Sequence, residues 1–153
     1  MVRDMDEKWL AVLIPLGFLI VFPLFWMGIG VLISFWGWRW LAAQYPEPRP
    51  FTGDYATGRS GAVGMSRYNH VLRVGADSEG LALAVMFLFR VGHPPLFIPW
   101  EEVASVERGG IFFHHVRLRF RRSRVAVLLH GRDLEDHLRA ASGGRFPLAP
   151  EVR

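Results

Sequence analysis

Residues 9–38, WLAVLIPLGFLIVFPLFWMGIGVLISFWGW, decide how this chain is organised. The run contains no charged side chain, and an α-helix needs only about 20 apolar residues to cross the hydrocarbon core of a bilayer. Trp9 at one end, and Trp36, Trp38 and Trp40 at the other, have the placement of interfacial aromatic anchors. We therefore predict one transmembrane helix over residues 9–38.

Other interpretations of this run were weighed against a single span. Pro15 and Pro23 weaken or kink a helix, so the run also fits a re-entrant hairpin that breaks near Pro23 or at Gly28–Gly30. A cleaved signal peptide is disfavoured because residues 1–8 are net acidic and the apolar run is too long. Gly30 and Ser34 have the small-xxx-small spacing that lets two helices approach, which offers a route to a homo-oligomer.

Length and charge constrain the part of the chain after this run. The chain has 153 residues, which leaves room for one small domain. It has no cysteine, which excludes disulfides, iron–sulfur clusters and thiolate nucleophiles. The formal net charge is +4, and the excess of basic residues lies after residue 38. We expect the chain in the inner (plasma) membrane. Arg39, Arg49 and Arg59 follow the run and Arg3 and Lys8 precede it, and by the positive-inside rule this slight excess favours a cytoplasmic C-terminal domain.

The rest of the sequence predicts a linker, an antiparallel β domain and a tail. Residues 1–8 are a short N-terminal tail, residues 39–64 a Pro/Gly-rich juxtamembrane linker, residues 65–142 the domain and residues 143–153 a C-terminal tail. Alternating or apolar runs predict strands, and Leu134 and Leu138 mark the apolar face of a closing helix. Strands are expected at 69–74, 81–89, 96–98, 103–108, 113–120 and 124–129, and the helix at 132–141. The apolar run 81–89 is either a strand buried on both faces or one that lies against a membrane or partner.

Four segments in this order carry a resemblance to a known superfold: HVLRVGADSEGLAL (70–83), PPLFIPWEEV (94–103), the basic hairpin around 117–124, and DLEDHLRAA (133–141). Together they resemble the pleckstrin-homology-like superfold, including its GRAM-type relatives, over roughly residues 68–141. The whole chain is similar to small bacterial membrane-anchored proteins with such a domain. The resemblance implies a membrane-anchored α+β protein. Phosphoinositide-binding members place basic residues around the first strand–turn–strand, whereas this chain has Asp77 and Glu79 there, with only Arg73 nearby.

Two features are candidate contact sites. The densest basic cluster alternates along a predicted hairpin, where it would face anionic lipid headgroups or an acidic partner, or form an ordinary solvated face. We call it the basic hairpin, and its residues are Arg117, Arg119, Arg121, Arg122 and Arg124. Trp100 comes directly after Pro99 in a constrained turn and is either a core anchor or a partner contact.

The sequence offers no constellation for catalysis. His114 and His115 are adjacent, so on a strand they point to opposite faces and do not share a metal ion. Glu101 and Glu102 suit a helix start better than acid–base chemistry. No nucleic-acid-binding motif is present. We predict no metal and no cofactor, and a non-enzymatic, membrane-tethered binding or adaptor module that acts on protein or anionic lipid. The alternative is a small accessory or assembly subunit of a larger integral-membrane complex, bound through its helix.

Overall fold

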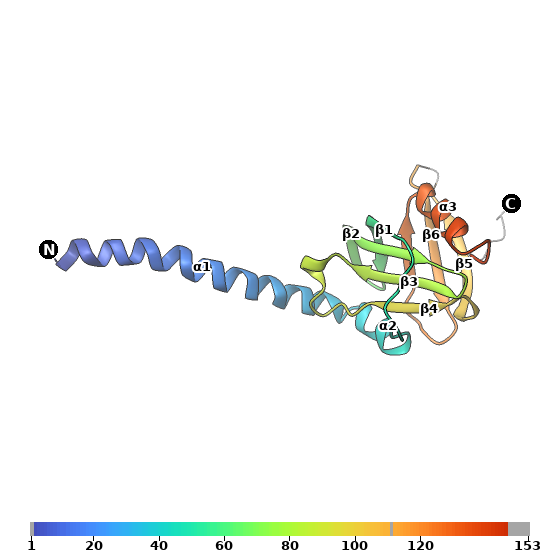
Figure 1. Cartoon of the computed structure of the whole chain (residues 1–153), viewed down its shortest axis with the longest axis horizontal. Coiled ribbons are helices and arrows are strands. Elements are labelled where there is room, and N and C mark those ends of the chain that lie inside the picture. Colours follow the sequence, from blue (N-terminus) through green and yellow to red (C-terminus); the bar gives the residue numbers. More distant parts are fainter. Residues whose placement is uncertain (1, 111, 147–153) are drawn as a thin grey trace.

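A long apolar helix projects from a curled antiparallel β-sheet in the computed structural model, which describes residues 2–110 and 112–146 (Figure 1). The chain begins with α1 (Val2–Ser34) and α2 (Trp38–Gln44) and ends with α3 (Arg132–Ala141). Between them lie seven strands and two 3-10 turns: β1 (Tyr55–Val63), β2 (Ser66–Ala76), β3 (Gly80–Val85), η1 (Phe87–Phe89), β4 (Leu96–Pro99), η2 (Trp100–Glu102), β5 (Val103–Gly109), β6 (His115–Phe120) and β7 (Val127–His130).

Helix α1 is long and apolar enough to cross a membrane. The segment Lys8–Ser34 has 27 residues and a mean hydropathy of 2.4. Its apolar side chains are exposed on all sides instead of being buried in the rest of the chain. The helix runs through Pro15 and Pro23 without a break, so the structure has one continuous helix in place of the re-entrant hairpin. It ends at Ser34, four residues before the expected position.

The sheet consists of two meanders joined through one shared strand. The strand order is β4-β3-β2-β1-β7-β6-β5, and every pairing is antiparallel. β1 pairs with β2 on one side and with β7 on the other, and register shifts on either side of Arg59 bend it. A Cβ at Gly61 would collide with the Leu128 carbonyl, so glycine permits this crossing. β4 and β5 do not pair, so the curled sheet is a half-barrel with an open seam.

The core lies inside the half-barrel, and helices close it. In Figure 1, β3 and β4 run along the direction of α1 while β5 and β6 run across it, and α3 lies on the side away from α1. Leu134 and Leu138 of α3 are buried, as the apolar spacing predicts. Trp38, Leu41 and Tyr45 belong to the same buried cluster. The folding unit therefore includes α2, and it begins well before residue 65.

Three expectations about local structure were wrong. The apolar run 81–89 is not one strand, because β3 ends at Val85 and the chain turns into η1. The stretch 39–64 is not only a linker, since it contains α2 and the nine-residue β1. Strand β7 is shorter than expected because residues 121–126 form the turn that precedes it. By contrast, α3 has the expected bounds, and β6 turns Val116, Leu118 and Phe120 inward.

Candidate functional site

The end of α1 is docked on the β domain by backbone and side-chain hydrogen bonds. The Ser66 hydroxyl donates to the Ile33 carbonyl (3.0 Å), and the Met65 amide donates to the Trp36 carbonyl (3.2 Å). Gly92 adopts φ +78°, and a Cβ there would lie 2.9 Å from the Cα of Val31. The helix therefore contacts the β1–β2 turn and the β3–β4 connection directly, without a flexible spacer.

A buried aromatic cluster fixes this junction from inside. The Trp38 indole donates to the Pro94 carbonyl (2.8 Å), and its ring packs edge-on against His93. The Tyr68 hydroxyl lies 3.0 Å from Nε2 of His93, whose Nδ1 lies 3.2 Å from the Val91 carbonyl. Burial raises the pKa of Tyr68 to about 12 and lowers the pKa of His93. Both groups are thus held uncharged and hydrogen-bonded, which suits a structural clamp.

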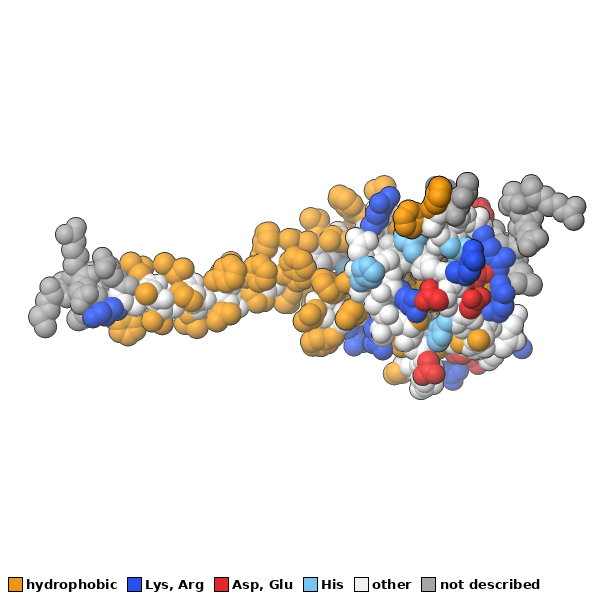
Figure 2. Space-filling view, turned by 90° about the horizontal axis from the view of Figure 1, so that it is seen from above, with side chains coloured by type: hydrophobic (Ala, Val, Ile, Leu, Met, Phe, Trp, Pro, Cys, Tyr) orange, Lys and Arg blue, Asp and Glu red, His pale blue; other side chains and the backbone are white. Residues whose placement is uncertain are grey.

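The β3–β4 connection forms an apolar notch against α1. Phe87 and Leu88 are 83% and 73% exposed, and the Phe89 ring lies 6.0 Å from that of Trp26. Figure 2 shows hydrophobic side chains covering the helix up to the domain, where charged side chains gather. The notch encloses about 780 Å³, and its walls are Phe22, Pro23, Trp26 and Met27 of α1 and residues 87–91. Exposed apolar side chains in this number mark a binding surface.

A small basic pocket adjoins the notch. It has a volume of about 210 Å³, and Phe87 and Arg90 line both cavities. Arg73 enters the pocket from β2, with its guanidinium 4.4 Å from the centre of the Tyr55 ring. Burial, and next the nearby Glu47, raise the pKa of Tyr55. Within residues 2–110 and 112–146, neither Arg73 nor Arg90 has a carboxylate at ion-pair distance, so both guanidinium groups are available to an anion.

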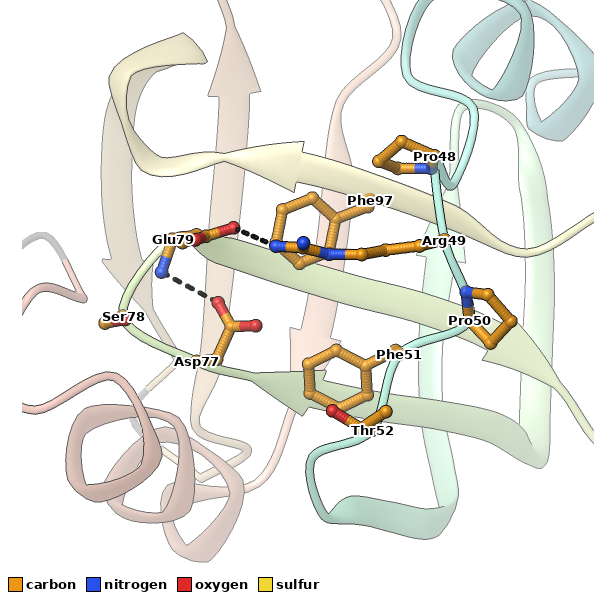
Figure 3. Close-up of a pocket in the computed structure, with 9 residues that line it drawn as sticks. All are labelled: Pro48, Arg49, Pro50, Phe51, Thr52, Asp77, Ser78, Glu79 and Phe97. Atoms are coloured by element: carbon orange, nitrogen blue, oxygen red, sulfur yellow. Dashed lines mark hydrogen bonds and ion pairs between the residues drawn. The ribbon is translucent and has the colours of Figure 1, made fainter.

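A third cavity, of about 490 Å³, lies over β3 and β4 and is shown in Figure 3. Arg49 extends across it to Glu79, with 3.1 Å between the two charged groups. The Asp77 carboxylate accepts the backbone amide of Glu79 (2.7 Å) and so shapes the β2–β3 turn. These charges pair with each other or with backbone in the open, so the cavity presents no activated group.

The basic hairpin is only partly available. Arg119 pairs with Glu107 (3.2 Å) and Arg122 with Glu102 (3.0 Å), while Arg121 donates to the Glu101 carbonyl (2.8 Å). Arg117 and Arg119 share the outer face of β6, and the other three lie in the β6–β7 turn, where Arg122 contacts Tyr45. In the part of the chain that the structure describes, Arg117 and Arg124 have no ion pair. All five side chains are exposed.

The turn between β5 and β6 carries two exposed aromatic residues. Phe112 and Phe113 are 91% and 83% exposed, on the side of the half-barrel where α3 lies. Two adjacent exposed aromatic rings at a hairpin tip are typical of a protein contact. Sequence reasoning placed Phe113 inside a strand and missed this tip.

The other candidate residues have clear positions. Trp100 is half-buried, donates to the Asp77 carbonyl (2.8 Å) and packs against Phe146, which places it as a core anchor. Trp9, Trp36 and Trp40 are exposed, and their role as interfacial anchors stays a prediction.

Two of the sequence interpretations need correction. Trp38 is fully buried in the domain, so it is no interfacial anchor. Ser34 is buried against Gly92 of the same chain, and Gly30 is half-buried beside the Val91 carbonyl, so only Gly30 of this pair stays partly open to another helix.

A buried carboxylate, missed from the sequence, ties α3 to the sheet. Glu135 is 5% exposed and binds Arg108, His114 (2.8 Å) and Arg139 (3.1 Å). Burial by itself raises the pKa of this carboxyl, but hydrogen bonds from Arg108 and His114 outweigh it and hold the pKa below its ordinary value. Arg108 and His114 lie 27 and 21 positions from Glu135 in the sequence. No local sequence pattern therefore predicts that these three side chains meet.

Comparison with known proteins adds no relative from which a role is transferable. No family model matches the chain, and no curated protein sequence or solved structure is detectably similar to it. Among residues 2–110 and 112–146, no group of three or more His, Cys, Asp or Glu side chains is arranged to hold a metal ion. The junction, the notch and the basic surfaces are therefore the basis for a functional assignment.

Proposed function

We propose that this chain is a single-pass inner (plasma) membrane protein whose β domain faces the cytoplasm and works as a non-enzymatic binding or adaptor module. The observation that carries the proposal is the docked helix. Its apolar side chains are exposed all round from Trp9 onward, which is costly in water, while its last turn is hydrogen-bonded into the domain. A helix of this kind anchors the domain and orients it.

The architecture supports a pleckstrin-homology-like assignment of the domain. Two antiparallel meanders share β1, an open seam separates β4 from β5, and a C-terminal amphipathic helix closes the half-barrel. Of these features, the resemblance in the sequence implies the antiparallel strands and the closing C-terminal helix. Because one fold serves many functions, the binding role is argued from the surface.

The mechanism is tethering with a fixed orientation. A domain confined to the membrane plane meets other membrane components at high effective concentration. Docking of α1 removes the freedom that a flexible linker would leave, so less ordering is needed when a partner binds. The outward surface offers Phe112 and Phe113 at one tip, and Arg117 and Arg124 with unpaired charge, to an acidic protein partner or anionic lipid.

Co-purification from the native membrane tests the proposal. The full-length chain is expected to stay in the pellet after alkaline carbonate washing, and to carry a stoichiometric membrane protein or an anionic lipid when extracted in mild detergent. Exchange of Arg117 and Arg124 for Glu is expected to abolish that association if the basic hairpin carries it. Release of the wild-type chain by carbonate would overturn the membrane assignment. Association unchanged by the double substitution would remove the basic hairpin from the mechanism.

A specific observation favours the second candidate, an accessory or assembly subunit bound through its helix. Phe18, Phe22 and Trp26 form an aromatic ladder along one face of α1, with ring centroids 5.1 and 6.3 Å apart. Exchange of Phe18 and Phe22 for Leu keeps the helix apolar and removes the ladder. The accessory-subunit hypothesis expects loss of the co-purified complex in this variant and not in the control Phe25→Leu, which alters an exposed position between the ladder residues along the helix. An intact complex in the ladder variant would reject it.

A further inference from the structure

The notch and the basic pocket lie side by side and share Phe87 and Arg90 in their walls. The notch has an apolar wall of α1 and η1 side chains, and the pocket has two guanidinium groups. The notch volume of about 780 Å³ lies within the about 300–1,000 Å³ usual for ligand sites. The acidic group that lines the pocket, Glu47, is engaged by the Phe51 amide (2.9 Å). The apolar notch and the cationic pocket thus meet at Phe87 and Arg90.

The position of the notch along α1 matches the edge of a bilayer. Counting about 20 residues from the interfacial Trp9 places the near edge of the hydrocarbon core around Gly28. The notch flanks Phe22–Met27, so its apolar wall lies at the depth of acyl chains. Arg90 directly follows η1 and lines both cavities, so the same count places it where phosphate groups begin, and Arg73 of β2 lines the basic pocket with it. A cation at that depth is attracted to anionic headgroups.

We propose that the notch and the basic pocket together bind one anionic phospholipid, with an acyl chain in the notch against Trp26 and Phe87 and the phosphate between Arg73 and Arg90. This inference rests on the proposed membrane anchoring and names a ligand for it. The site is separate from the basic hairpin, whose Arg119, Arg121 and Arg122 are already bonded to Glu107, Glu101 and Glu102.

Lipid retention in the full-length chain tests the proposal. The chain is placed in nanodiscs that contain equal amounts of phosphatidylglycerol and phosphatidylcholine, extracted in mild detergent, and examined by native mass spectrometry. The wild type is expected to keep one phosphatidylglycerol, and Arg73→Gln with Arg90→Gln to keep about tenfold less. The matched control, Arg132→Gln with Arg145→Gln, removes the same charge at exposed positions outside both cavities and the basic hairpin, and is expected to retain lipid like the wild type.

Further variants keep the test decisive. If loss of the Arg73–Tyr55 stacking impairs folding, Arg90→Gln alone serves, because this side chain is exposed and its loss breaks no ion pair within the described residues. Phe87→Ser is expected to weaken phospholipid retention severalfold, since the acyl chain loses its apolar wall. Equal retention of phosphatidylcholine, unchanged retention in the arginine variants, or inorganic phosphate bound as tightly as the lipid would overturn the proposal. Carbonate release of the wild type would instead overturn the membrane anchor itself.

Discussion

Exchange of Glu135 for Gln is expected to destabilise the β domain by about 2 kcal/mol. Loss of one partner of a buried ion pair costs about 3–5 kcal/mol when the other charge stays buried. Here the facing Arg108 and Arg139 side chains are 27% and 42% exposed, so water compensates part of the lost attraction. Gln keeps the shape of the side chain, and the predicted loss is therefore electrostatic and not a cavity effect.

Chemical denaturation of the full chain in detergent, monitored by tryptophan fluorescence, measures this loss. For a domain of this size, 2 kcal/mol corresponds to a fall in Tm of about 8 °C. Asp136→Asn is the matched control, because it removes one negative charge from an exposed position on the same helix, and a change within about 0.5 kcal/mol is expected. Equal stability of the two variants would refute the argument.

The pH dependence supplies a second check on Glu135. Because the folded-state pKa lies below the ordinary value of 4.5, the unfolded chain takes up protons first as the pH falls. The stabilisation is complete above pH 4.5 and disappears as the pH falls through the folded-state pKa. The difference in unfolding free energy between the wild type and the Gln variant must therefore disappear at acidic pH. A difference that persists there would show that the charge is not responsible.

Three other perturbations concern the junction. Trp38→Ala is expected to cost about 3–5 kcal/mol of unfolding free energy, against almost nothing for the exposed Trp40→Ala, in the same denaturation assay. Gly92→Ala is expected to cost more than Gly143→Ala by about 1–2 kcal/mol, because both have positive φ but only Gly92 touches α1; equal losses would contradict the docking of the helix. Since burial lowers the pKa of His93, its contribution is full above about pH 6.5 and declines as the pH falls, and His93→Gln is expected to remove that decline from a series of denaturation midpoints.

Strong periodicity made several elements predictable. Leu134 and Leu138 sit four residues apart between Gly131 and the Gly143–Gly144 pair, and this pattern alone gives α3 its bounds. The alternation of apolar and polar residues along β6 predicts which of its side chains point inward. The uncharged run gives α1, because about thirty residues without a charged side chain make a helix that is apolar on every face.

The failures have a common physical cause in tertiary contacts. β1 is rich in Gly, Ser and Thr, yet it forms because β2 and β7 supply hydrogen bonds on both sides. Trp38 looks like a membrane anchor in a row of tryptophans, but the turn at 35–37 redirects it into the core. The run 81–89 is uniformly apolar for two different reasons. Its first half is buried in the sheet, and its second half lies exposed against α1.

Docking of α1 assigns different heights to the two basic surfaces. Arg90 lies beside the helix at the level of the notch, whereas Arg117 and Arg119 lie on β6, in the layer that runs across the helix direction (Figure 1). A bilayer reached by α1 therefore meets Arg90 first. The proposal leaves the outer face of β6 and the Phe112 tip for a protein partner. It therefore assigns lipid binding and partner binding to separate surfaces of one domain. Loss of lipid in an Arg90 variant with the partner still bound would demonstrate that division.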